Sequence, residues 1–209
     1  MDKSLRIAYN ISRNIRTKKE KKKKRKNKEI KVELNMSKKV LIVVDMQRDF
    51  IDGSLGTKEA QAIVPNVKKK IEEYKARGEQ VIFTQDTHYE DYLLTLEGKK
   101  LPVKHCIKDT PGWEIHPDLD TTMCTKIQKN TFGYMHWKSY GAILAGGEIE
   151  LVGVCSGICV LSNAIILKAT FPGTEITVDA SCCACVNSES HKNALEAMKM
   201  CQINIINEE

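Results

Sequence analysis

The stretch Val40–Phe50, VLIVVDMQRDF, decides the fold class. Its first five residues are apolar without alternation and mostly β-branched, which is the pattern of a strand covered on both faces. Such strands belong to parallel sheets, whose connections are usually helices. Asp45 closes the run, and an acid at the end of a buried strand must be paired or functional. We therefore expect a central parallel strand here, with polar chemistry at its carboxyl end.

Five further short apolar runs follow at the spacing of alternating strands and helices. The expected strands cover Gln80–Thr84, Thr125–Gln128, Glu150–Val154, Glu175–Val178 and Gln202–Ile206. Apolar residues at helical spacing predict helices over Ala60–Arg77, Cys159–Ala169 and Glu189–Met200, with Ser188 as the cap of the last. The expected fold class is α/β: a three-layer α/β/α sandwich with a central, mostly parallel six-stranded sheet, Rossmann-like in organisation.

The composition is that of a globular protein: 209 residues, of which 42% are hydrophobic and 29% charged. No apolar run approaches the roughly 18 residues that span a bilayer. The amino-terminal residues lack the apolar stretch of a secretory signal, so we expect a cytoplasmic protein. In that setting the eight cysteines are expected to be reduced thiols rather than disulfides.

Positive charge is concentrated in the amino-terminal part of the chain. Residues 1–36 hold fourteen Lys and Arg against four Asp and Glu, a net +10, so the whole chain's +6 leaves −4 for residues 37–209. We interpret 1–36 as a basic, disordered extension and 37–209 as the folded domain. The extension is either a tether to nucleic acid or anionic membrane or, as we favour, a segment without function before a domain that opens at Met36. The acidic domain itself is not expected to bind nucleic acid or membrane.

Polar and reactive side chains stand directly after four of the expected strands. Asp45 follows the first, Asp86 and His88 the second, Lys129 the third, and Cys155–Cys159 the fourth. In a doubly wound parallel sheet, ligands bind beyond the carboxyl ends of the strands. The connection over residues 87–121 is too long for a plain loop and is expected to be functional as well. The sequence therefore predicts a functional site at this edge of the sheet.

Cys159 lies at a turn from a strand into a helix, where the helix N-terminus favours a thiolate. Taken singly, Asp45, Lys129 and Cys159 also have ordinary readings as an ion-paired acid, a solvated lysine and a buried thiol. Taken together they supply a base, a cation and a nucleophile, which is what thiol catalysis needs. Gly153 and Gly157 allow the tight backbone that an oxyanion site made of amide groups requires.

Three motifs, in order, resemble the signatures of isochorismatase-like cysteine hydrolases, and of their nicotinamidase-like members in particular. They are D-x-Q-x-D-F at Asp45–Phe50, K-N-T-F-G from Lys129, and G-V-C-S-G-I-C-V ending at Val160, and the resemblance covers residues 38–206. It implies that Asp45, Lys129 and Cys159 form a catalytic triad. Isochorismatases themselves lack the cysteine, so its presence argues for cleavage of a C–N bond.

The resemblance also implies the surroundings of the nucleophile. The backbone amides of Ser156 and Cys159 would form the oxyanion hole, shaped by a cis peptide between Cys155 and Ser156. Many relatives carry Thr-Asp where this chain has Ser156-Gly157. That departure removes a side chain near the nucleophile but keeps the backbone donors.

Asp86 and His88, two residues apart at the end of an extended strand, point the same way, and Glu97 and His105 follow in the long connection. Mixed nitrogen and oxygen ligands suit Zn²⁺, Fe²⁺ or Mn²⁺, although such sparse spacing is also compatible with no metal. The resemblance implies that Asp86, His88 and His105 bind one divalent metal ion, with Zn²⁺ preferred over Fe²⁺ or Mn²⁺. Glu97 is a weaker candidate for a fourth ligand.

The implied activity is hydrolysis of nicotinamide to nicotinate and ammonia through a thioester on Cys159, in NAD salvage. The substrate pocket is expected to include Gln47, Phe50, Tyr134 and Cys155, with Leu101 where relatives often have an aromatic partner for the Phe50 ring. A homo-oligomer is expected. Two alternatives stay open: a cysteine hydrolase of another small amide or carbamoyl compound, and an RNA- or membrane-associated protein acting through residues 1–36.

The remaining cysteine cluster and histidines are not expected to bind a metal or to act in catalysis. The Ser181–Cys185 stretch, SCCAC, lacks the second cysteine pair of a zinc site. His116 is expected to form loop hydrogen bonds, and His191 to be structural in the last helix. His136 is expected near the pocket or a subunit interface.

Overall fold

One six-stranded sheet organises the protein, for which the computed structural model describes residues 39–208. The strands are β1 (Lys39–Val44), β2 (Gln80–Asp86), β3 (Thr125–Lys129), β4 (Glu148–Val154), β5 (Glu175–Ala184) and β6 (Asn204–Ile206). They lie in the order β3-β2-β1-β4-β5-β6, and every neighbouring pair is parallel. The predicted α/β fold is confirmed, and the sheet is wholly rather than mostly parallel. The basic extension predicted over 1–36 lies outside the described residues, so its boundary remains a prediction.

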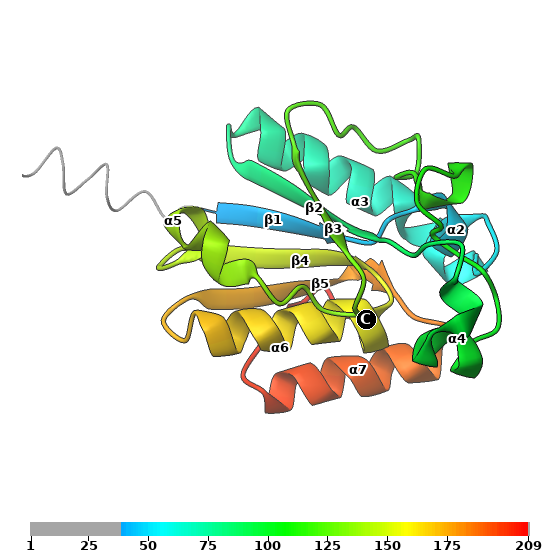
Figure 1. Cartoon of the computed structure of the whole chain (residues 1–209). Helices are drawn as coiled ribbons and strands as arrows, with labels where there is room; N and C mark the ends of the chain where they lie inside the picture. The colour runs from blue at the N-terminus through cyan, green and yellow to red at the C-terminus, as the bar shows by residue number, and fades with distance from the viewer. Residues whose placement is uncertain (1–38, 209) are drawn as a thin grey trace, which may run out of the picture. The chain divides into compact units, whose positions relative to one another are not determined.

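Helices cover both faces of the sheet (Figure 1). Helix α3 (Lys58–Ala76) covers one face, and α6 (Leu161–Thr170) and α7 (Ser188–Met200) cover the other. The shorter elements are α2 (Arg48–Ile51), η1 (Tyr92–Leu94), α4 (Leu96–Lys100), η2 (Pro111–Trp113), η3 (Trp137–Tyr140), α5 (Gly141–Leu144) and η4 (Ser156–Val160). Among the described residues, no helix is both long enough and apolar enough to cross a membrane.

Strand β1 explains why its sequence is apolar without alternation. Val40, Ile42 and Val44 face the core beneath α6 and α7, whereas Leu41 and Val43 face the core beneath α3. All five side chains are at most 1% exposed. Both faces of β1 therefore require apolar residues, as expected for the middle of a doubly covered sheet.

The strand order reverses direction between β1 and β4, which is where a doubly wound sheet opens a crevice for ligands. Gly153, near the end of β4, has φ +121°, and a Cβ there would collide with the carbonyl oxygen of Val44. Only glycine permits this approach of the two backbones. The residues after β1 and β4, Asp45 and Cys155, are thereby brought close to the same point.

Several predicted boundaries were wrong. Strand β5 runs to Ala184 instead of ending at Val178, and β2 extends to Asp86. Helix α7 is capped by Asn187, whose side-chain oxygen accepts a 2.8 Å hydrogen bond from the Ser190 amide, and not by Ser188. Cys159 does not open the regular helix α6, because it lies in the preceding π-helical turn η4. Such turns are frequent at functional sites.

Candidate active site

Asp45, Lys129 and Cys159 meet at the carboxyl edge of the sheet, as predicted. The Lys129 ammonium lies 2.7 Å from the Asp45 carboxylate and 3.8 Å from the Cys159 sulfur. All three side chains are buried. They come from the residue after β1, from the end of β3 and from the turn after β4, which all lie at the carboxyl edge of the parallel sheet. The arrangement places a carboxylate, an ammonium and a thiol in one contiguous group.

Burial sets the protonation of this group. It raises the pKa of the Cys159 thiol well above its ordinary value, and the Asp45 charge raises that pKa further against the opposing effect of Lys129. The thiolate predicted from the helix N-terminus is therefore not the resting form, because desolvation outweighs the helix effect. Burial also raises the pKa of Asp45, while Lys129 opposes that rise. In the resting state, Cys159 is therefore a thiol, and it lies beside the Asp45 carboxylate, which can accept its proton.

Asp45 is held by the neighbouring strand. The Thr84 hydroxyl donates a 2.6 Å hydrogen bond to Asp45 Oδ1, and the Asp45 amide donates to the Thr84 carbonyl. These contacts leave the second carboxylate oxygen for Lys129. Thr84 was not predicted as a site residue, since nothing in its local sequence distinguishes it from an ordinary strand threonine.

The turn η4 carries the nucleophile. The Cys155 carbonyl accepts hydrogen bonds from the amides of Ile158 (3.0 Å) and Val160 (3.1 Å), which fixes the backbone on both sides of Cys159. The cis peptide lies between Val154 and Cys155, one residue earlier than predicted. The proposed oxyanion donors, the amides of Ser156 and Cys159, belong to this turn.

A histidine on α7 supports the same turn. His191 Nδ1 lies 2.9 Å from the hydroxyl of Ser156, which is fully buried. His191 was predicted as structural, and its contact with η4 could not be foreseen because it depends on how α7 packs. The Ser156 side chain is thus engaged away from Cys159, in agreement with a role for Ser156 through its backbone only.

Asp86, His88, Glu97 and His105 bring their ligand atoms within 4.8 Å of one another. His88 Nε2 lies 3.0 Å from Asp86 Oδ2 and 3.7 Å from Glu97, and His105 Nε2 lies 3.8 Å from Asp86 Oδ2. The other ring nitrogen of His105 is 2.8 Å from the Val103 carbonyl, which orients Nε2 toward the cluster. Two imidazoles and two carboxylates, mostly buried, are a donor set suited to Zn²⁺, Fe²⁺ or Mn²⁺. Glu97, the weaker candidate, belongs to this cluster.

Asp86 joins the cluster to the triad. Its Oδ1 lies 3.4 Å from the Lys129 ammonium, while its Oδ2 contacts His88. Burial by itself would raise the pKa of Asp86, but the His88 hydrogen bond and Lys129 hold that pKa below its ordinary value. The same carboxylate therefore serves both groups, and it carries a negative charge in both roles.

Gln47 positions Asp86 and does not line the pocket as predicted. Its side chain is fully buried, donates to the Asp86 carbonyl (2.8 Å) and accepts from the Asp86 amide (2.7 Å). It also donates to the Trp113 carbonyl at 2.8 Å. Because β1 ends at Val44, the Gln47 amide supplies the partner that Asp86 would otherwise find on that strand.

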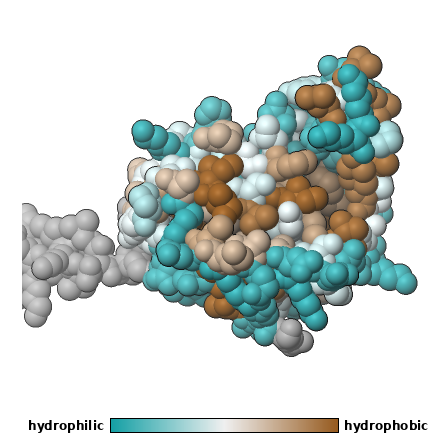
Figure 2. All heavy atoms as spheres, turned by 90° about the horizontal axis from the view of Figure 1, so that it is seen from below, coloured by the Kyte–Doolittle hydropathy of each residue, from teal (hydrophilic) through white to brown (hydrophobic). Residues whose placement is uncertain are grey.

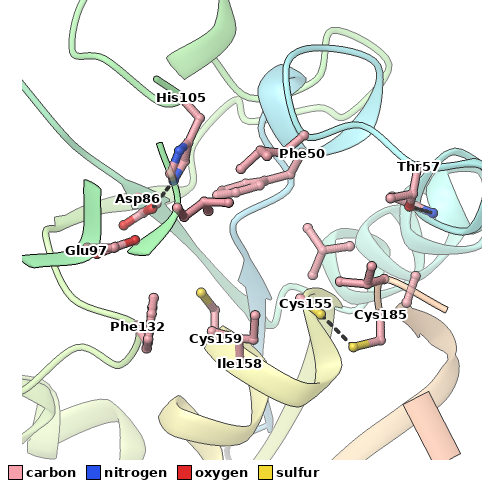
Figure 3. Close-up of a pocket in the computed structure, with 16 residues that line it drawn as sticks. Phe50, Thr57, Asp86, Glu97, His105, Phe132, Cys155, Ile158, Cys159 and Cys185 are labelled. Carbon is pink, nitrogen blue, oxygen red and sulfur yellow. Dashed lines mark hydrogen bonds and ion pairs between the residues drawn. The ribbon is translucent and has the colours of Figure 1, made fainter. Parts of the chain in front are cut away.

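A cavity of about 370 Å³ opens beside Cys159 and the metal-ligand cluster (Figure 3). Phe50 and Cys155 line it, as predicted. Tyr134 does not, because it packs on the Trp137 ring with centroids 5.2 Å apart. Phe132, which was not singled out, lines the cavity instead. The complete lining is Phe50, Leu55, Thr57, Ala60, Asp86, Glu97, Leu101, His105, Phe132, Val154, Cys155, Ile158, Cys159, Ala184, Cys185 and Val186.

The mouth of the cavity is apolar. Leu101, Phe132, Ile158 and Val186 line it and remain at least 39% exposed. Figure 2 shows apolar residues gathered toward the carboxyl-edge end of one face, around a hollow in the surface. Inside, the Phe50 ring lies 5.5 Å from the His105 ring. The cavity therefore suits a flat apolar group whose polar atoms face the cluster and the thiol.

Comparison with known proteins gives consistent matches. A model of the isochorismatase domain matches residues 39–209. A Bacillus subtilis protein described as an uncharacterized isochorismatase family protein, PncA, is 29% identical over 172 residues, covering 76% of this chain and 92% of that one. The nicotinamidase/pyrazinamidase of Mycobacterium tuberculosis is 24% identical over 188 residues, covering 80% and 98%. The crystal structure of the Pyrococcus horikoshii pyrazinamidase in complex with zinc superposes with a TM-score of 0.69 at 27% identity, covering 81% and 98%.

Proposed function

Because this chain belongs to the isochorismatase family, we propose that it is a nicotinamidase-like cysteine hydrolase, which cleaves nicotinamide to nicotinate and ammonia. The observation that carries the proposal is the contact of Lys129 with both Asp45 and Cys159, beside a cavity that Cys159 lines together with residues of a cluster able to bind a metal. Supporting it, the Mycobacterium tuberculosis and Pyrococcus horikoshii relatives are named as a nicotinamidase/pyrazinamidase and a pyrazinamidase. Such an activity would act in NAD salvage.

The proposed reaction begins with transfer of the Cys159 proton to Asp45. Lys129, whose pKa is raised above its ordinary value by Asp45, Cys159 and Asp86 despite burial, stays charged and compensates the developing thiolate. The sulfur attacks the carboxamide carbon, and the amides of Ser156 and Cys159 hold the oxyanion. Asp45 returns its proton to the amine as the C–N bond breaks and ammonia leaves. Water then hydrolyses the thioester and restores the thiol.

Asp86, His88, Glu97 and His105 would hold a divalent metal ion, for which Zn²⁺ is the first candidate. Bound there, the ion would supply a Lewis-acidic site for the ring nitrogen of the substrate. The residues of the chain do the remaining positioning. Phe50 and Phe132 offer apolar surfaces for the ring, and the position of Cys159 fixes where the carboxamide must lie.

The decisive experiment measures ammonia release from nicotinamide by the purified protein, with benzamide as the matched substrate. Benzamide has the same shape but lacks the ring nitrogen, so it reports on amide cleavage without anchoring at the cluster. Cys159→Ala should abolish ammonia release while the circular dichroism spectrum stays unchanged. Retained activity in that variant would refute the mechanism. Cleavage of carbamoyl compounds in preference to nicotinamide would refute the substrate assignment but not the nucleophile.

The rival function through residues 1–36 predicts a different result. Binding to RNA or to anionic vesicles should then fall with salt and disappear on removal of that segment, in a protein that hydrolyses no amide. We expect instead that removal of residues 1–36 leaves ammonia release unchanged, because the triad and the cluster lie within residues 45–159.

A further inference from the structure

Two thiols that the proposed mechanism does not use are in contact in the wall of the cavity. The sulfur atoms of Cys155 and Cys185 lie 2.8 Å apart, closer than the about 3.5–4.0 Å at which non-bonded heavy atoms usually meet. Both are free cysteines, and both line the cavity that contains Cys159. Figure 3 draws the pair on the opposite side of Cys159 from Asp86, Glu97 and His105.

The sheet itself generates this pair. Strands β4 and β5 are parallel neighbours, and Val154 pairs with Ala184 as the last register partners. Cys155 and Cys185 are the next residue on each strand, so they leave the sheet side by side. Gly157 completes the arrangement, because a Cβ at that position would lie only 3.2 Å from the Cys185 sulfur. The glycine that departs from the family pattern thus leaves the space that the second thiol occupies.

We propose that Cys155 and Cys185 are a redox modification site, at which a hydroperoxide converts the two thiols to a reversible disulfide that lowers hydrolysis at Cys159. One sulfur attacks the peroxide oxygen, giving a sulfenic acid and releasing an alcohol, or water from hydrogen peroxide. The second sulfur displaces hydroxide from the sulfenic sulfur, which leaves as water with the thiol proton. Two thiols are oxidised by two electrons, and one peroxide bond is reduced. A dithiol restores the pair by thiol–disulfide exchange.

The consequence for the nucleophile follows from the turn η4. A disulfide would draw the sulfurs together by about 0.8 Å, from 2.8 Å to the roughly 2.05 Å of an S–S bond. The Cys155 carbonyl accepts from the amides of Ile158 and Val160, so a shift of Cys155 moves the backbone on both sides of Cys159. It also closes the part of the cavity wall where both thiols lie. This effect on activity rests on the proposed function, whereas the disulfide rests only on the geometry of the pair.

The reaction is selective but slow. Burial and the neighbouring Cys185 raise the pKa of Cys155 to about 12, so Cys155 remains a thiol at neutral pH. Contact between the sulfurs favours the second step strongly, because both reacting groups are already in place. Cys201, which is exposed, and Cys124, which is half-buried, should react with alkylating agents before and after peroxide treatment without forming this link.

The first test maps the disulfide independently of catalysis. The full chain and its Cys159→Ala variant are treated with hydrogen peroxide, alkylated, digested without reduction and analysed by mass spectrometry. We expect one linked peptide pair joining Cys155 to Cys185, lighter by two hydrogen atoms, in both proteins. It should be absent from Cys185→Ala and present in the matched control Cys201→Ala. A link from Cys155 to Cys159, or no link between Cys155 and Cys185, would overturn the proposal.

The second test follows ammonia release during peroxide treatment, each variant being compared with its own reduced form. The Cys201→Ala protein should lose activity several-fold and regain it with dithiothreitol. Cys185→Ala should lose less under the same treatment, since the disulfide cannot form. If the linked protein hydrolyses nicotinamide as fast as the reduced protein, the regulatory part of the proposal is wrong. If the reduced protein releases no ammonia, the proposed function fails, while the mapping still decides the disulfide.

Discussion

Replacement of Gln47 by leucine should destabilise the protein and disturb the metal-ligand cluster together. The side chain makes three buried hydrogen bonds, two of them to the backbone of Asp86 and one to the Trp113 carbonyl. Leucine has a similar size but can neither donate nor accept. Trp113 keeps a 3.3 Å bond from Gln85, whereas the Asp86 amide and carbonyl lose the partner described above.

The magnitude follows from these partners. Leaving a buried donor or acceptor unsatisfied costs about 1–3 kcal/mol, and a lost hydrogen bond with a remaining partner about 1 kcal/mol. Gln47→Leu should therefore lower the free energy of unfolding by about 3–7 kcal/mol. Gln85→Leu is the matched control, because the Gln85 side chain is also buried and donates only the long bond to Trp113. It should cost about 1 kcal/mol.

Urea denaturation measures the free energy of unfolding of both variants. Zinc titration of the folded variants measures their affinity for zinc. Gln47→Leu should weaken zinc binding because Asp86 loses its fixed backbone, whereas Gln85→Leu should not. A cost below 1 kcal/mol for Gln47→Leu, or equal zinc affinity in the two variants, would refute the positioning role of Gln47.

Substitutions at four further positions have expected outcomes. His105→Ala should reduce zinc affinity, measured by calorimetry, by more than the roughly 10–100-fold that loss of a supporting contact costs. Glu97→Gln should reduce zinc affinity by less than His105→Ala does. Equal effects of the two substitutions would contradict the assignment of Glu97 as the weaker ligand. Lys129→Met should abolish ammonia release and cost about 3–5 kcal/mol in urea denaturation, because buried carboxylates lose their cation. That cost should shrink as the pH falls, since protonation removes the buried charges, and a pH-independent cost would count against this origin. Gly146→Ala is the control for Gly153→Ala, because φ at Gly146 is +72° and an added Cβ there meets nothing, so only backbone strain of about 1–3 kcal/mol is expected. Gly153→Ala should lower the free energy of unfolding by more than that, because its Cβ collides with the Val44 carbonyl oxygen. Similar melting temperatures of the two variants would exclude the collision.

The parts of the site that sequence predicted are those set by strand ends. Asp45, Asp86 and Lys129 each stand just after an expected strand, and parallel strands carry their ends to one edge, so local pattern and a general rule suffice. The parts that sequence missed depend on packing between distant elements. The role of Gln47 requires knowing that β1 ends before β2, and the contact of His191 requires the position of α7.

Strand β5 shows the same limit in another form. Its hydropathy is broken at Asp179, so the strand was expected to end at Val178. Asp179 is nevertheless buried, because Lys70 of α3 lies 2.7 Å from its carboxylate. The ion pair lets the strand continue to Ala184, and only then does Cys185 reach the edge where Cys155 stands. Because the Lys70–Asp179 ion pair joins distant parts of the sequence, the position of Cys185 in the cavity wall could not be predicted from the sequence.

The shared carboxylate of Asp86 has a consequence for how substitutions combine. His88, Glu97 and His105 belong to the cluster alone. In double-mutant cycles, the changes that their substitution and the substitution of Asp45 make in the activation free energy of amide cleavage should therefore add. Asp86 contacts both Lys129 and His88, so its substitution should be non-additive with changes on either side. In a mutational scan that selects only for metal-independent cleavage, the other three positions should become permissive while Asp86 stays intolerant. Of the four cluster residues, Asp86 is therefore the one at which loss of the metal also reaches the triad.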